Sequence, residues 1–151
     1  MVIPKFICEF TTNHMGNFNI LMEMVKKASE TGADYIKMQK KDVDNFYTKE
    51  KLESSYVSPY GKTYGDYRRI FEFDKREFDH FDLECKKHNI KWFATAQDLP
   101  SLKFLLDYNL DMYKLASCNA NKKELLTEFS LLIPSDKTVV VSVAGRKIEE
   151  I

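Results

Sequence analysis

Short apolar runs alternate with stretches of helical periodicity along most of this chain. The apolar runs are nearly continuous and end at polar or turn-forming residues, a pattern that is typical of strands buried on both faces. We expect strands at 6–10, 35–38, 91–95, 112–117 and 138–142. We expect helices at about 19–31, from 74 onward, at 99–108 and at 121–129.

Two of the expected helices carry boundary signals. In the first, apolar residues recur at i, i+3, i+4 and i+7 from Leu21, and Gly32 lies where a C-terminal cap belongs. In the second, Asp74 is an expected N-cap, and Glu77 three residues later has the capping-box spacing. Residues 40–73 are polar and aromatic, with Pro and Gly that mark turns. Within this stretch we expect a loop, YVSPYGKTYGDY (56–67), which is either a packed loop or, as is common for a loop of this length, a functional one.

Alternating strands and helices predict an α/β fold with a parallel sheet covered by helices. Two architectures fit, an open doubly wound sheet and a (β/α) barrel. A barrel ordinarily needs about 250 residues, and this chain has 151. On length alone the open sheet is favoured, and no linker divides the chain into two domains.

Composition narrows the classes of function. Lys and Arg together number 23, as do Asp and Glu, so the formal net charge is zero and nucleic acid is not an expected partner. No apolar stretch is long enough for a membrane helix, and the N-terminal residues do not resemble a signal peptide. Cys8, Cys85 and Cys118 have no CxxC spacing, which indicates reduced thiols in a cytoplasmic protein.

Polar side chains occur at the carboxyl ends of all five expected strands. They are Glu9 on the first, Lys37 and Gln39 on the second, Thr95, Gln97 and Asp98 on the third, Lys114, Ser117 and Asn119 on the fourth, and Ser142 on the fifth. Ligands of parallel α/β folds bind at these ends. Two ammonium groups with several hydroxyls suit a dianionic phosphate that has a carboxylate nearby.

A structural alternative stands beside each of these interpretations. A single lysine near a strand end usually extends to solvent or pairs with a carboxylate, and Glu9 could be only such a partner. His14 could serve only to cap a loop, while His80 and His88 are expected to be surface or packing residues of the second helix.

Six segments together resemble the N-terminal half of the sialic acid synthase (N-acetylneuraminate synthase) family. In order they are CEFTTNHMGN, GADYIKMQK, GKTYGDYRRIFEF, WFATAQD, YKLAS and VVVSVAGRKIEEI. The resemblance implies a TIM-type (β/α) barrel, of which residues 1–151 would form about the first five strands, in place of the open sheet. It also implies a transferase that condenses phosphoenolpyruvate with N-acetylmannosamine or a related amino sugar.

The resemblance assigns roles by position. Lys37, Thr95, Lys114, Ser117 and Ser142 match residues that bind phosphoenolpyruvate. Glu9 matches an acidic residue that contacts the sugar, and Asn119, Asn121 and Gln39 are weaker candidates for that role. Glu9 and Lys114 are the residues expected to be catalytic. Asn119 departs from the family pattern, which has an acidic residue there.

The family uses a divalent metal ion, Mn²⁺ or Mg²⁺, and the resemblance places its ligands beyond this chain. It also places a C-terminal antifreeze-like domain beyond it. We therefore expect residues 1–151 to be a partial barrel domain that forms a homo-oligomer or needs a partner to complete the barrel. Two alternatives stay open: a degenerate or truncated half barrel that acts as an anion-binding or assembly module, and a Schiff-base aldolase that uses Lys114 or Lys37.

Overall fold

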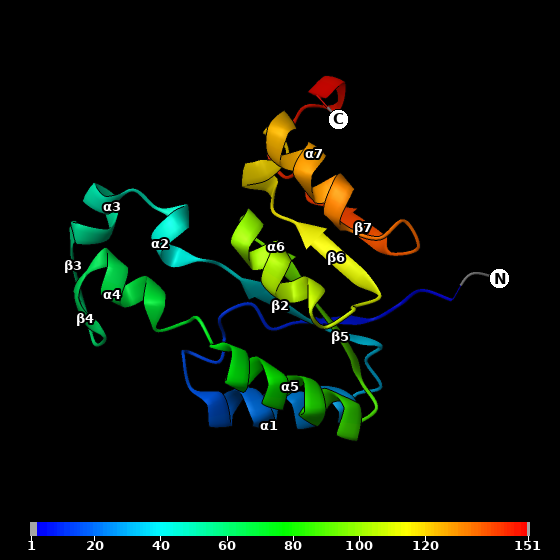
Figure 1. Ribbon diagram of the computed structural model, residues 1–151. Helices are drawn as coiled ribbons and strands as arrows, with labels where there is room; N and C mark the ends of the chain where they lie inside the picture. The colour runs from blue at the N-terminus through cyan, green and yellow to red at the C-terminus, as the bar shows by residue number, and fades with distance from the viewer. Residues whose placement is uncertain (1–2, 151) are drawn as a thin grey trace. The chain divides into compact units, whose positions relative to one another are not determined.

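The computed structural model describes residues 3–150, and its main feature is a five-stranded sheet (Figure 1). The strands are β1 (Ile7–Glu9), β2 (Tyr35–Lys40), β5 (Lys91–Ala96), β6 (Met112–Leu115) and β7 (Thr138–Val141). They lie in the order β1-β2-β5-β6-β7, and the pairs β1–β2, β5–β6 and β6–β7 are parallel. All five predicted strands are confirmed, with ends displaced by one or two residues.

The strand order decides between the two architectures. Apart from the separate β3–β4 pair, the strands are arranged in the sheet in the order in which they occur along the chain. A doubly wound sheet instead reverses its order at a switch point, which places its first strand inside the sheet. The order is that of the first strands of a (β/α) barrel, so the open sheet favoured by length is wrong.

Contacts divide the chain into two compact units. The first contains the residues up to 38 together with 43–92, and the second contains 39–42 together with the residues from 93 onward. Two of the three boundaries fall within β2 and β5, and the third falls between residues 42 and 43.

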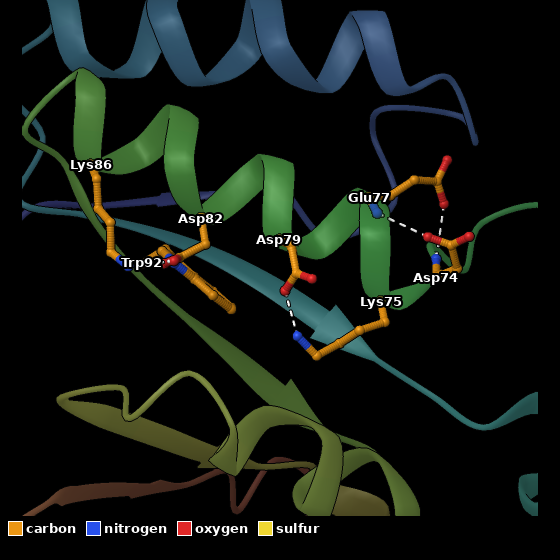
Figure 2. A network of polar contacts seen from close by, with 7 residues as sticks. All are labelled: Asp74, Lys75, Glu77, Asp79, Asp82, Lys86 and Trp92. Carbon is orange, nitrogen blue, oxygen red and sulfur yellow. Dashed lines mark hydrogen bonds and ion pairs between the residues drawn. The ribbon is translucent and has the colours of Figure 1, made fainter.

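Two helices of the first unit, α1 (Phe18–Glu30) and α5 (Lys75–Lys87), pack side by side (Figure 1). The apolar face of α1 is buried at the predicted period, and Gly32 follows its end with a φ of 76°. At the start of α5, the Asp74 carboxylate accepts from the Glu77 N–H and the Glu77 carboxylate accepts from the Asp74 N–H, both at 2.8 Å. Figure 2 shows this reciprocal cap, which confirms the predicted capping box.

Side chains of α5 also make polar contacts, which Figure 2 shows. Lys75 pairs with Asp79 and Lys86 pairs with Asp82, each at the i, i+4 spacing. The Trp92 indole N–H donates to Asp82 at 2.8 Å, so the buried ring has its polar atom satisfied.

The polar and aromatic stretch 40–73 contains regular structure that the sequence pattern did not reveal. Its elements are α2 (Val43–Phe46), α3 (Lys49–Glu53), β3 (Ser55–Ser58), β4 (Gly61–Thr63) and α4 (Tyr64–Arg69). Strands β3 and β4 form an antiparallel hairpin at the turn that Pro and Gly marked. Aromatic rings hold the segment together, with Tyr64 contacting Tyr47 at 5.2 Å and Tyr56 at 5.7 Å between ring centroids. The expected loop at 56–67 is therefore a hairpin followed by a short helix, and its rings are packed.

The second unit adds α6 (Leu99–Leu106) and α7 (Lys123–Leu132), which contact each other, and two short 3₁₀ helices, η1 (Ser117–Asn119) and η2 (Ile148–Glu150). The Asp98 carboxylate caps α6 by accepting from the Ser101 N–H at 2.8 Å. Its other oxygen accepts from the Asp42 N–H at 2.9 Å. These bonds fix the segment that follows β5.

The three cysteines are free. Cys85 is fully buried in α5, and burial raises the pKa of its thiol, as expected for a packing residue. Cys118 is exposed. Across the described residues, none of the helices is both long and apolar enough to cross a membrane.

Candidate functional site

In the first unit, Glu9, the last residue of β1, forms an ion pair with Lys37, which lies within β2. The two residues are partners in the parallel register, so their side chains lie on the same face of the sheet. The Lys37 ammonium is 2.9 Å from Glu9 Oε1, and the side chains are 9% and 50% exposed, respectively. A nearly buried ammonium is therefore held beside a carboxylate that still reaches solvent. A lysine near a strand end was expected, as the structural alternative, to pair with a carboxylate. Lys37 does so in the structure.

The chain after β1 turns back onto this pair. The Thr11 N–H donates to Glu9 Oε1 at 3.1 Å and also lies 3.4 Å from the Lys37 carbonyl. The Phe10 N–H donates to the same carbonyl at 2.9 Å. Backbone groups thus fix both the carboxylate and the strand that carries the lysine. Sequence reasoning missed Thr11, although the polar run TTNHMGN directly after a strand was a signal for a structured turn.

His14 is buried in the first unit and serves the loop that follows β1. Its Nδ1 accepts a hydrogen bond from the Gly16 N–H at 3.1 Å, and its ring lies against Phe73 with centroids 4.5 Å apart. Burial lowers the pKa of His14, while a hydrogen bond to the Thr11 backbone acts in the opposite direction. The loop-capping alternative is confirmed.

The other two histidines belong to the surface of the first unit. His80 contacts the Phe18 ring, with centroids 5.1 Å apart. His88 Nε2 lies 3.1 Å from a Glu84 carboxylate oxygen one helical turn away. Both are packing or surface residues, as predicted.

In the second unit, Thr95 and Lys114 are register partners on the parallel strands β5 and β6, so their side chains share one face of the sheet. Thr95 is 2% exposed, and its Oγ1 has no hydrogen-bond partner among the described residues. Lys114 is half-buried. A buried hydroxyl without a partner is uncommon in folded proteins and calls for an explanation such as a bound water, ion or ligand.

The two predicted serines lie beyond strand ends of the same unit. Ser117 begins η1, directly after β6, and Ser142 follows β7. The Ser142 N–H donates to the Leu115 carbonyl at 3.1 Å, which keeps Ser142 beside the end of β6. Both residues are half-buried. Each lies just beyond the end of a strand, which is the position that the sequence predicted.

The weaker sugar candidates of this unit have different environments. Asn119 is completely buried, and its Nδ2 donates to the Gln97 carbonyl at 2.7 Å, while its Oδ1 has no hydrogen-bond partner among the described residues. Asn121 is exposed, and Gln39 is half-buried. The structure therefore does not bring Asn119 and Asn121 together at one accessible surface. Gln97, one of the polar residues expected at a strand end, contributes its backbone carbonyl to Asn119, a role that no side-chain signal in the sequence indicates.

A divalent metal ion, which the family resemblance implies, needs several His, Cys, Asp or Glu side chains close together. Within the described part of the chain, no group of three or more His, Cys, Asp and Glu side chains is placed to hold a metal ion. The described residues by themselves do not fit the divalent metal ion that the resemblance implies.

The NeuB family model matches residues 24–151, which is most of the chain. This chain belongs to the NeuB family. Among curated proteins, this NeuB-family chain is 34% identical over 122 residues to the N-acetylneuraminate-9-phosphate synthase of Drosophila melanogaster. That match covers 80% of this chain and 33% of the fly protein. The NeuB-family chain thus spans about a third of the length of this relative.

Solved structures agree with this membership. The N-acetylneuraminic acid (sialic acid) synthetase of Leptospira borgpetersenii, crystallised with citrate, superposes with a TM-score of 0.77 at 26% identity. The superposition covers 98% of the NeuB-family chain and 47% of the synthetase. The DAHP synthase of Thermotoga maritima matches with a TM-score of 0.63 at 16% identity, over 97% of this chain and 36% of that one, which supports the fold alone.

Proposed function

We propose that the protein containing this chain condenses phosphoenolpyruvate with N-acetylmannosamine or a related amino sugar to give a sialic-acid-type nonulosonate. In this reaction the methylene carbon of phosphoenolpyruvate bonds to the aldehyde carbon of the open-chain sugar. Water supplies the oxygen at the former enol carbon, and the bond from that carbon to the phosphate oxygen breaks to release phosphate. Membership of the NeuB family and the names of its relatives support this class of reaction.

The observation that carries the proposal is the Glu9–Lys37 pair. Active sites of (β/α) barrels lie at the carboxyl ends of the strands, and Glu9 is the last residue of β1, with Lys37 as its partner in the register of β2. The ammonium suits a phosphate or carboxylate of phosphoenolpyruvate, and the half-exposed carboxylate suits the hydroxyls of a sugar. An ammonium in an ion pair is an anion clamp rather than the neutral amine that a Schiff base requires.

The residues of the second unit complete the proposed assignment. Thr95, Lys114, Ser117 and Ser142 would bind phosphoenolpyruvate, and Gln39 and Asn121 would contact the sugar. The unsatisfied, buried Thr95 hydroxyl supports the first of these roles. Lys114 would balance the developing negative charge of the departing phosphate. The metal ligands would come from outside this chain, and no step through the metal is derived from these residues.

The test is an assay of the natural protein that contains residues 1–151, with Mn²⁺ and phosphoenolpyruvate. N-acetylmannosamine and its 6-phosphate are supplied in parallel, because the fly relative is named for a 9-phosphate product. We expect phosphate release that depends on one of the two sugars, and formation of the matching nonulosonate by mass spectrometry. Calorimetric binding of phosphoenolpyruvate without turnover would favour the anion-binding module instead, and a borohydride-trapped adduct with pyruvate would favour the aldolase.

We also propose that β7 is covered by a further part of the protein or by a second copy. Val139 and Val141 of this strand are 44% and 45% exposed, and Leu131 of the adjoining helix α7 is 79% exposed. Exposed apolar groups on a sheet edge favour pairing with another strand.

The 151-residue chain on its own is therefore expected to sediment as a dimer or larger species in analytical ultracentrifugation. Val139→Lys together with Val141→Lys should shift it toward the monomer, while Thr138→Lys, a change at an already polar position of the same strand, should not. A wild-type chain that remains monomeric and does not bind a hydrophobic dye would contradict this proposal.

A further inference from the structure

Within the second unit, the ends of β2, β5 and β6 are joined by hydrogen bonds at Gln97. The Gln97 N–H donates to the carbonyl of Lys40, the last residue of β2, at 3.0 Å. The Gln97 carbonyl accepts from Asn119 Nδ2, in the segment after β6, at 2.7 Å. Both backbone groups of the residue that follows β5 are therefore bonded to the segments on either side of it.

Asp98, the next residue, extends this link to the segment after β2. One carboxylate oxygen accepts from the Ser101 N–H at 2.8 Å and caps α6, and the other accepts from the Asp42 N–H at 2.9 Å. A helix cap needs only one side-chain oxygen. The second oxygen makes a partly buried bond between residues 56 positions apart in the sequence. Asp98 therefore fixes Asp42 as well as the first turn of α6.

The bond between Gln97 and Lys40 also defines how β2 faces β5. Both groups lie at the carboxyl ends of neighbouring strands, so the two strands run in the same direction. In the parallel pair β6–β7, the Ser142 N–H donates to the Leu115 carbonyl, and the residue before Ser142 is the register partner of Leu115. By the same relation, Ala96 faces Lys40.

One position earlier along both strands, Gln39 faces Thr95, which is itself the register partner of Lys114. Residues that face each other in this way share one face of a sheet, so the three side chains form a row across β2, β5 and β6. The Thr95 hydroxyl in the middle of the row is buried, and its Oγ1 has no hydrogen-bond partner among the described residues. Gln39 and Lys114 are half-buried. The row joins a proposed sugar contact to two proposed phosphoenolpyruvate contacts.

We propose that Asp98 is a positioning residue for Gln39. Gln39 lies three residues before Asp42, in a segment whose bonds to Gln97 and Asp98 hold it against the end of β5. These bonds keep the Gln39 amide opposite Thr95, where it binds a hydroxyl of the acceptor sugar beside phosphoenolpyruvate. This inference rests on the proposed function for the role of Gln39 toward the sugar. The bond from the Asp42 N–H to Asp98 stands on its own geometry and has its own readout.

Asp98→Ser removes the bond to Asp42 and keeps the helix cap. Serine caps helices about as well as aspartate does, but its single oxygen is then used in the cap. We expect the KM for the sugar to rise roughly 3- to 10-fold, the effect of losing one hydrogen bond. The KM for phosphoenolpyruvate should stay within about twofold of wild type, because Thr95 and Lys114 remain paired across β5 and β6. An equal rise of both KM values, or an unchanged KM for the sugar, would overturn the proposal.

Asp74→Ser is the matched control, because it makes the same change at the N-cap of α5. The Asp74 carboxylate accepts from the Glu77 N–H, and serine followed by glutamate three residues later is still a capping box. Both KM values should remain within about twofold of wild type in this variant. A sugar KM raised as much as in Asp98→Ser would show that any altered helix cap has this effect, and would contradict the positioning role. If Asp98→Ser does not fold, Asp98→Thr, which also has one acceptor oxygen, takes its place.

A double-mutant cycle tests whether Asp98 acts through Gln39. In a Gln39→Met background, Asp98→Ser should add less than about twofold to the KM for the sugar, because the amide that Asp98 positions is already gone. Effects that multiply fully in the double variant would assign Asp98 a general structural role and reject the proposal.

Hydrogen exchange of the Asp42 amide, followed by NMR, gives a readout that needs no turnover. Protection of this amide should fall by about tenfold in Asp98→Ser, the equivalent of one lost hydrogen bond, and be retained in Asp74→Ser. Unchanged protection in Asp98→Ser would overturn the positioning role. An absence of turnover in the wild type with the expected exchange pattern would instead reject the proposed function alone.

Discussion

Lys37→Met is expected to weaken phosphoenolpyruvate binding by about 2–4 kcal/mol, or roughly 30- to 1,000-fold in Kd. Methionine preserves the packing of the aliphatic stem within β2 but removes the ammonium. The site loses a positive charge that is only 9% exposed and so is weakly screened by solvent. Isothermal titration of the natural protein with phosphoenolpyruvate measures the change directly.

The matched control for this substitution is Lys27→Met. Lys27 also forms a 2.9 Å ion pair, with Glu30, but its side chain is 70% exposed on α1. An exposed pair contributes little, so this variant should bind phosphoenolpyruvate as the wild type does. If both variants bind equally well, the Glu9–Lys37 pair is a structural ion pair and the anion clamp is assigned to the wrong residue.

Local signals predicted the main elements because each depends on residues close in sequence. The Asp74–Glu77 capping box and the period of α1 are of this kind, and both are present in the structure. The elements between 43 and 69 were missed because they are short and have no hydrophobic period. Ring contacts between residues distant in sequence stabilise them, such as Tyr47 with Tyr64. The strand order, which settled the architecture, is likewise a tertiary property.

In the candidate site, too, the sequence predicted local features but not those that depend on tertiary contacts. The types of side chain at strand ends indicated an anion site, and the register places Glu9 beside Lys37 and Thr95 beside Lys114. Burial and partners could not be read from the sequence. His14 gave no sign that it bonds to the backbone of its own loop, and Asn119 gave no sign that it is fully buried.

Asn119 shows how burial changes the meaning of a substitution. The family resemblance places an acidic residue here, which suggests that Asn119→Asp would improve a synthase. The structure predicts the opposite. The Asn119 amide donates to the Gln97 carbonyl at 2.7 Å, and an ionised aspartate would set a carboxylate oxygen against that carbonyl in a fully buried position.

We therefore expect Asn119→Asp to lower the free energy of unfolding by about 3 kcal/mol or more at pH 7. Burial raises the pKa of such an aspartate above its unfolded value, and a protonated carboxyl can donate to the Gln97 carbonyl as the amide does. The deficit relative to wild type should then be small below about pH 4 and grow as the pH rises. Urea unfolding followed by circular dichroism at several pH values measures both effects.

Asn121→Asp is the control for Asn119→Asp, because it makes the same change of charge two residues further on at an exposed position. Its free energy of unfolding should stay within about 0.5 kcal/mol of wild type across the same pH range. Equal stability of both variants at pH 7 would mean that the site at 119 can hydrate or neutralise a carboxylate. The acidic residue of the family pattern would then be compatible with this fold, and the amide would be a substitution that affects chemistry rather than packing. A deficit confined to Asn119→Asp would show that this chain has converted the position into a buried hydrogen-bond donor for the segment after β5.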